Sequence, residues 1–239
     1  TDFSIDYVAT SASIDNLFGT RALAYFSWSD VMGDQRISLG SNLVMNFENS
    51  DIQLSYAFLK NRTNYYALLF QQANTFGLGY SLLYDYYGQL RDYGVALYAQ
   101  YPFSKFSRID YGATLRGVEY NIKQFDIYTY KTSTYYTEKL NALIPMFSYV
   151  FDNSSNTYTG PNDGLRYYFT FQASPKLGQD SISFNTYKFD IRKYFKINRE
   201  YSFATRLMFG SSSGERPQKF FLGGNSQLTI LDRKSTRLN

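Results

Sequence analysis

Residues 201–224 read YSFATRLMFGSSSGERPQKFFLGG, and their pattern indicates how the whole chain folds. Over the first ten residues, aromatic or aliphatic side chains alternate with small or polar ones. A pleated strand imposes a period of two, because successive side chains point to opposite sides. The alternation therefore predicts a β-strand. Its apolar face carries Tyr201, Phe203, Thr205, Leu207 and Phe209, and its polar face carries Ser202, Ala204, Arg206, Met208 and Gly210.

The same alternation recurs upstream at the spacing of β-hairpins. Eleven strands are predicted, at about 21–30, 36–47, 51–60, 64–73, 76–87, 92–102, 108–121, 138–150, 165–174, 182–195 and 201–210. Their apolar faces include five side chains that we expect to contact lipid, namely Leu39, Leu54, Leu82, Leu97 and Phe169.

The composition fits a β-barrel that crosses a membrane. Aromatic residues make up 20% of the chain and charged residues 18%, while the mean hydropathy is only −0.37. No apolar run reaches the roughly 18 residues of a transmembrane helix. A transmembrane β-barrel needs no such run, because only every second residue faces lipid. We therefore predict an all-β fold, an antiparallel transmembrane β-barrel.

The chain contains no cysteine and no histidine. Their absence excludes disulfides, zinc or haem sites that need these ligands, and nucleophilic catalysis by Ser-His-Asp or Cys-His groups. The carboxylates show no spacing suited to general acid–base chemistry. Acidic and basic residues are interspersed around a net charge of +4, so no nucleic-acid-binding patch is apparent. We expect no enzyme activity, no catalytic residue, no metal site and no cofactor.

A polar loop and a double glycine follow the strand at 201–210. This order resembles the sixth extracellular loop of the outer-membrane-protein-85 superfamily, the BamA-type or bacterial surface antigen barrels. In that family an F-x-x-GG motif opens a loop that folds back into the barrel lumen. The matching residues are Phe220, Phe221, Gly223 and Gly224. We expect the two glycines to act as a hinge, with an ordinary turn as the alternative.

Two further features agree with this resemblance. Asp152, Pro161 and Gly164 are similar to the D…P…G turn that lies on the periplasmic side between the family's eighth and ninth strands. Eleven predicted strands precede the loop, as in the family, whose barrel has about sixteen. The resemblance therefore implies an incomplete antiparallel transmembrane β-barrel, with about eleven of the family's strands. If the strand at 21–30 rises from the periplasm, the turn at 152–164 is periplasmic and the loop at 211–224 is extracellular.

Charged residues on the polar faces form a second candidate site. Arg166, Asp190, Arg192 and Arg206 are expected to face the lumen. The resemblance implies a charged wall that receives the returning loop. Simple solvation inside a water-filled pore remains the alternative.

The chain divides into three predicted regions. Residues 1–18 are expected to be a lead-in, in which Phe3 to Tyr7 resemble a stretch that precedes the barrel in family members with a β-propeller. Residues 19–228 are expected to form the partial barrel, with its first and last strands unpaired. Residues 232–239 lack alternation and aromatic side chains, and Leu228, Thr229 and Ile230 stand where the family carries its R-G-F/Y tip. We therefore expect residues 229–239 to be a disordered tail.

The resemblance also implies a function. It places the chain in the bacterial outer membrane, in contact with lipid, and gives it a role in assembling or translocating unfolded outer-membrane or secreted proteins. A passive porin or transporter barrel, with selectivity set by lumen charges, is the alternative. An outer-membrane lipase is disfavoured, because histidine is absent.

Overall fold

The computed structural model describes residues 2–15, 19–44, 47–81, 83–158, 160–198 and 201–220. These residues form one large antiparallel sheet with a single short 3-10 helix, η1 (Phe47–Asn49). None of the described helical residues forms a segment long and apolar enough to cross a membrane. The strands are β1 (Phe3–Asp15), β2 (Gly19–Asp30), β3 (Gln35–Val44), β4 (Asp51–Phe58), β5 (Asn64–Tyr80), β6 (Tyr84–Pro102), β7 (Ser107–Asp126), β8 (Thr132–Asp152), β9 (Ser155–Thr157), β10 (Gly160–Ser174), β11 (Phe184–Lys196) and β12 (Ser202–Ser213).

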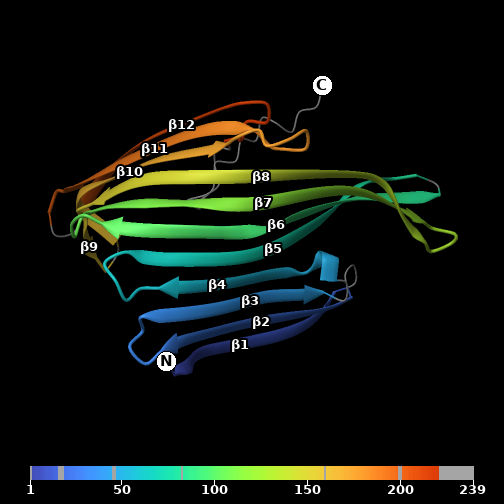
Figure 1. Ribbon diagram of the computed structural model, residues 1–239, viewed down its shortest axis with the longest axis horizontal. Coiled ribbons are helices and arrows are strands. Elements are labelled where there is room, and N and C mark those ends of the chain that lie inside the picture. Colours follow the sequence, from blue (N-terminus) through green and yellow to red (C-terminus); the bar gives the residue numbers. More distant parts are fainter. Residues whose placement is uncertain are drawn as a thin grey trace.

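The strands lie side by side in chain order, as Figure 1 shows. Each main strand pairs with the next, and β9 pairs only with β10. Among the described residues, β1 and β12 form the two edges and do not pair with each other. The predicted all-β antiparallel architecture and the predicted open sheet are therefore confirmed.

Two sequence predictions are corrected by the strand pairing. Residues 3–15, expected to belong to a lead-in, form edge strand β1 by pairing with β2, with one register shift between Ile5 and Tyr7. The strand at 21–30, expected to be an unpaired edge, is therefore paired on both sides. The division expected between strands at 64–73 and 76–87 is wrong: β5 is continuous from Asn64 to Tyr80, and β6 begins at Tyr84. Asn74 and Thr75 resemble a turn locally, but pairing with Leu90 and Gln89 of β6 extends the strand through them.

One strand is added at 3–15 and one predicted boundary is lost within β5, so the number of main strands is the same as predicted. The direction of β2, however, differs from the prediction. Strand β2 runs toward the end of the sheet that holds residues 153–158, whereas the sequence predicted that it runs away from that end. The turn at 153–158 and the loop at 214–220 nevertheless lie at opposite ends of the sheet, as expected. Leu82 and residues 221–239 lie outside the described residues.

The two faces of the sheet differ in exposure. On one face Ala96 and Thr186 are 1% and 0% exposed, whereas on the other Leu97 and Leu207 are 59% and 65% exposed. In a single sheet, curvature crowds the side chains of the concave face. We call the crowded face the inner face and the other the outer face. Four of the residues expected to contact lipid share the outer face, namely Leu39, Leu54, Leu97 and Phe169.

Apolar side chains form a continuous band on the outer face. One row of directly paired residues crosses seven strands, from Phe26 through Leu39, Leu54, Leu69, Val95 and Leu115 to Leu143. In β12 the band has moved along the strand, to Phe203, Leu207 and Phe209. Strands that are tilted relative to a barrel axis produce such a shift.

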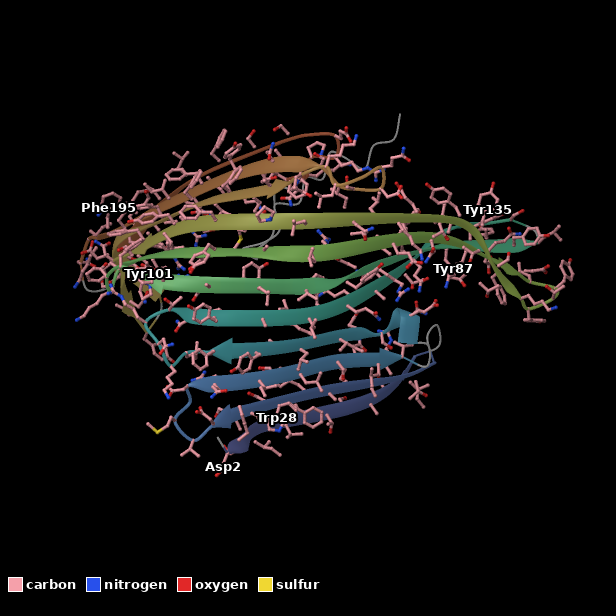
Figure 2. All side chains as sticks on the ribbon, viewed as in Figure 1. Asp2, Trp28, Tyr87, Tyr101, Tyr135 and Phe195 are labelled. Carbon is pink, nitrogen blue, oxygen red and sulfur yellow. The ribbon has the colours of Figure 1, made fainter. Side chains whose placement is uncertain are left out.

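The two ends of the sheet also differ. The short-turn end carries the connections at 31–34, 59–63 and 103–106 and the turn at 153–158. At the other, long-loop end, β5 to β8 extend well beyond their neighbours β4 and β10. Figure 2 shows Tyr87 and Tyr135 on this extension, whereas Tyr101 and Phe195 lie at the short-turn end.

Candidate functional site on the inner face

Three arginines lie in one line across the inner face. Arg166 of β10 is directly opposite Arg192 of β11, which is directly opposite Arg206 of β12. Like charges in this arrangement repel each other. Repulsion among the three arginines would therefore destabilise this strand register if nearby carboxylates did not neutralise their charges.

Asp190 neutralises two of the arginines. Arg192 donates from Nε and Nη2 to its two carboxylate oxygens at 3.0 and 3.1 Å. Arg206 donates from Nε and Nη2 to Oδ2 at 2.9 and 2.5 Å. The Asp190 side chain is only 1% exposed. Arg166 belongs to a separate pair, with Asp152 at 3.2 Å. The structure thus divides the four predicted lumen charges between two ion-pair groups.

The segment after β12 turns back toward β8. Gly214 has a φ of 134°, and a Cβ atom there would lie 2.5 Å from the carbonyl oxygen of Ser183. The Arg216 backbone N–H donates to that same oxygen at 3.2 Å. The Arg216 guanidinium then donates to Glu138 of β8 at 2.8 Å. These contacts carry the chain across the ends of β11 and β10.

The segment then returns to the inner face of β12. The Gln218 backbone N–H donates to Ser212 Oγ at 2.9 Å. The Phe220 ring covers Gly210, where a Cβ atom would lie 2.8 Å from a ring carbon. Lys188, directly opposite Gly210, holds its Nζ 5.9 Å from the centre of the same ring. Phe220 therefore lies on the inner face beside the Asp190 group.

The rest of the predicted loop motif, Phe221, Gly223 and Gly224, lies outside the described residues. Its hinge role stays a prediction. Sequence reasoning missed Gly210 and Lys188 as the surface under Phe220. One feature of the sequence indicates this contact. Gly210 has no side chain and lies on the polar face of the predicted strand, and the apolar pair Phe220 and Phe221 follows that strand in the chain.

The residues of the predicted D…P…G motif meet in one turn at the short-turn end. Asp152 accepts a hydrogen bond from the Ser154 backbone at 3.0 Å. Gly164 has a φ of 111°, and a Cβ atom there would lie 2.7 Å from the carbonyl oxygen of Asn153. Pro161 pairs with Asn156 of β9 next to a register shift. The periplasmic location of this turn stays a prediction.

The inner face carries another ion pair that the sequence did not reveal. Arg116 of β7 donates to both oxygens of Asp92 of β6 at 2.7 and 2.6 Å. No group of three or more carboxylate, histidine or cysteine side chains among the described residues could hold a metal ion. The inner face therefore carries ion pairs whose arginines Arg116, Arg166 and Arg206 are partly exposed. Such a surface can bind polar or anionic groups.

Comparison with known proteins defines the fold of this chain. No protein-family model matches the sequence, and no curated protein matches it. A similar solved structure is the crystal structure of BamA from Haemophilus ducreyi lacking POTRA domains 1-3, with 14% sequence identity and a TM-score of 0.56. The similarity covers 90% of this chain and 42% of that chain. The chain is therefore an open antiparallel sheet with the fold of part of a BamA-like β-barrel.

Proposed function

We propose that this chain is part of a BamA-type barrel of the bacterial outer membrane that assembles or translocates unfolded protein clients. The observation that carries this proposal is the returning segment 214–220, which places Phe220 on Gly210 beside the Asp190 group. In an assembly barrel, a docked segment can stabilise one conformation of the barrel, and undocking of the segment allows a second conformation to form.

The outer face supports contact with lipid. Its apolar band ends at the short-turn end in neighbouring aromatic rings, such as Phe151 with Tyr167 and Phe195 with Phe203. Aromatic rings favour the membrane–water interface, where membrane barrels carry aromatic girdles. Bacterial barrels have short periplasmic turns and longer extracellular loops. We therefore infer that the short-turn end faces the periplasm.

Strand β1 offers a place for client addition. Its residues 7–14 read YVATSASI and contain no charge and no proline. Charges and prolines are the common means of blocking an edge strand, so this edge is open to further pairing. An extended client segment could add to it by backbone hydrogen bonding. We infer that client strands add at the β1 edge.

The test uses the full-length parent protein with Gly210→Val or Phe220→Ala. Valine at position 210 would fill the place of the Phe220 ring, whereas alanine at 220 removes the ring. Loss of this burial is expected to slow client assembly about tenfold while the barrel remains inserted. Gly77→Val is the matched control, because no atom lies within 4 Å of a Cβ atom built there.

Client assembly and membrane insertion are measured on the same preparations. Wild-type assembly rates in both variants would refute a role for the docked segment. An increase in single-channel conductance without an assembly defect would instead support the passive pore. The same assay tests the predicted hinge through Gly223→Val and Gly224→Val, which are expected to impair assembly and spare insertion.

A further inference from the structure

We propose that a groove on the outer face, at the long-loop edge of the apolar band, binds a membrane lipid with an anionic phosphate headgroup. The inference rests on the outer-membrane placement proposed above and adds a specific ligand site to it. Lipid is the occupant to which the proposal commits, because the groove opens on the face that carries the apolar band.

The strand register shows how sharply this face changes character. Leu69, Val95 and Leu115 form a row of directly paired apolar residues. The next row toward the long-loop end consists of Gln71, Tyr93 and Gly117. The row after that contains Arg91, Glu119 and Lys139. Within two rows the surface changes from purely apolar to charged, as at the boundary between acyl chains and headgroups.

A groove of about 460 Å³ crosses this boundary. Ile52, Leu69 and Val95 line its apolar part, and Arg91 and Glu119 line its polar part. A purely polar ligand would leave the apolar walls in contact with water, and a hydrocarbon would leave the Arg91 Nε without a hydrogen-bond acceptor. An amphiphile satisfies both parts of the groove.

The charges at the polar part favour an anion. Arg91 donates to Glu119 at 3.3 Å and to Gln71 at 3.5 Å, both longer than a strong charge-assisted hydrogen bond. Its Nε is buried without a hydrogen-bond partner among the described residues. Lys139 lies 3.8 Å from the same Glu119, and its side chain is 64% exposed. One carboxylate thus faces two cations, and the remaining positive charge is suited to one phosphate group.

Arginine and lysine play different roles in this site. The Arg91 guanidinium lies 5.9 Å from the centre of the Tyr93 ring, which limits its orientation. A planar, oriented guanidinium can bind two phosphate oxygens at once, whereas a lysine acts as a mobile point charge. Arg91 would therefore position the headgroup, and Lys139 would strengthen its attraction.

The experiment uses the full-length parent in lipid nanodiscs of phosphatidylcholine with a minor fraction of phosphatidylglycerol. Native mass spectrometry measures the phosphatidylglycerol retained by the protein. Arg91→Gln and Lys139→Gln should each reduce its retention about fivefold, the typical effect of one basic group at a membrane surface. Lys193→Gln is the matched control, because Lys193 pairs with Leu165 on the outer face near the short-turn end.

The outcomes separate this inference from the proposed function. Equal retention of the two lipids by the wild type, or equal losses in the Lys193→Gln control, would overturn the lipid site while leaving the barrel proposal intact. Displacement of the lipid by millimolar inorganic phosphate would identify a free-anion site and also overturn it. Failure of the wild-type protein to insert into lipid would overturn the membrane placement itself.

Discussion

At the residue scale, Asp190 is the side chain on which the inner face depends most. It is almost fully buried and receives hydrogen bonds from Arg192 and Arg206, which lie directly opposite each other. Removing one partner of a buried ion pair costs about 3–5 kcal/mol, and the half-exposed Arg206 places this case near the lower limit. Asp190→Asn should therefore destabilise the folded sheet by about 3 kcal/mol.

The measurement for Asp190→Asn is urea-induced unfolding in detergent micelles, followed by intrinsic fluorescence. Asp110→Asn is the control, because the ion-pair partner of Asp110 among the described residues is the partly exposed Arg108. Equal unfolding midpoints for wild type and Asp190→Asn would show that water solvates both arginines without the carboxylate.

Asp126, at the tip between β7 and β8, gives a prediction about pH. The backbone N–H groups of Thr129 and Tyr128 donate to its carboxylate at 3.0 and 2.9 Å and hold the pKa of Asp126 below its ordinary value. A lowered pKa in the folded state means that the turn is stabilised above the ordinary pKa. This stabilisation is lost as the pH falls through the folded-state pKa.

The measurement is an NMR titration of the Tyr128 and Thr129 amide protons from about pH 6 to about pH 2. Their chemical shifts should change together at a pH below the ordinary Asp pKa. Asp126→Asn keeps a side-chain acceptor but does not titrate, so its amide shifts should stay constant. A transition in the asparagine variant would assign the effect to another group.

At the element scale, the extension of β5 to β8 beyond the apolar band forms a unit of its own. Tyr80, Tyr128, Tyr130 and Tyr135 at its tip are 74–90% exposed, so the tip buries little apolar surface. Replacing residues 78–86 and 124–133 with Asn-Gly turns would join strand residues that are already paired. We expect the shortened protein to fold and insert as the wild type does.

Heat-modifiable migration on gels and recovery in the membrane fraction test this expectation. A second variant, Leu97→Asp, provides the contrast, because it places a charge within the apolar band and should reduce insertion. If the shortened protein failed to fold, the tip would have to contribute stability that its exposed side chains do not indicate.

At the scale of the whole molecule, the openness of the sheet can be tested with introduced cysteines. The chain has no cysteine of its own, so each engineered thiol is unambiguous. Thr10 lies directly opposite Ala24, within the Cα separation that a disulfide requires. Thr10→Cys with Ala24→Cys should therefore cross-link on oxidation. Thr10→Cys with Leu207→Cys should not, because β1 and β12 are separate edges.

Mass spectrometry of proteolytic fragments identifies each cross-link in the chain of 239 residues. Concentration-independent formation of the 10–207 disulfide within one molecule would mean that the sheet closes on itself. The chain would then be a small complete barrel rather than part of a larger one.

The sequence by itself determined the fold class and the two faces of most strands. The period-two alternation places Leu39, Leu54, Leu97 and Phe169 on one face wherever the strand begins or ends. A register shift of one residue would move every apolar side chain of a strand to the opposite face. The local alternation therefore determines which side chains of a strand share a face. The sequence also excludes disulfides and the sites that need histidine or cysteine, because neither residue is present, whatever the fold.

Only the tertiary structure decided which segments pair and which charges meet. Residues 3–15, Asn74 and Thr75 carry weak local signals and become parts of strands because β2 and β6 supply partners for their backbone groups. The register of β11 with β12 brings Arg206 next to Asp190, which lies sixteen positions earlier in the chain. The place of Phe220 over Gly210 depends on how the following loop turns. Such contacts join residues distant in the chain, and a local pattern of side chains contains no information about them.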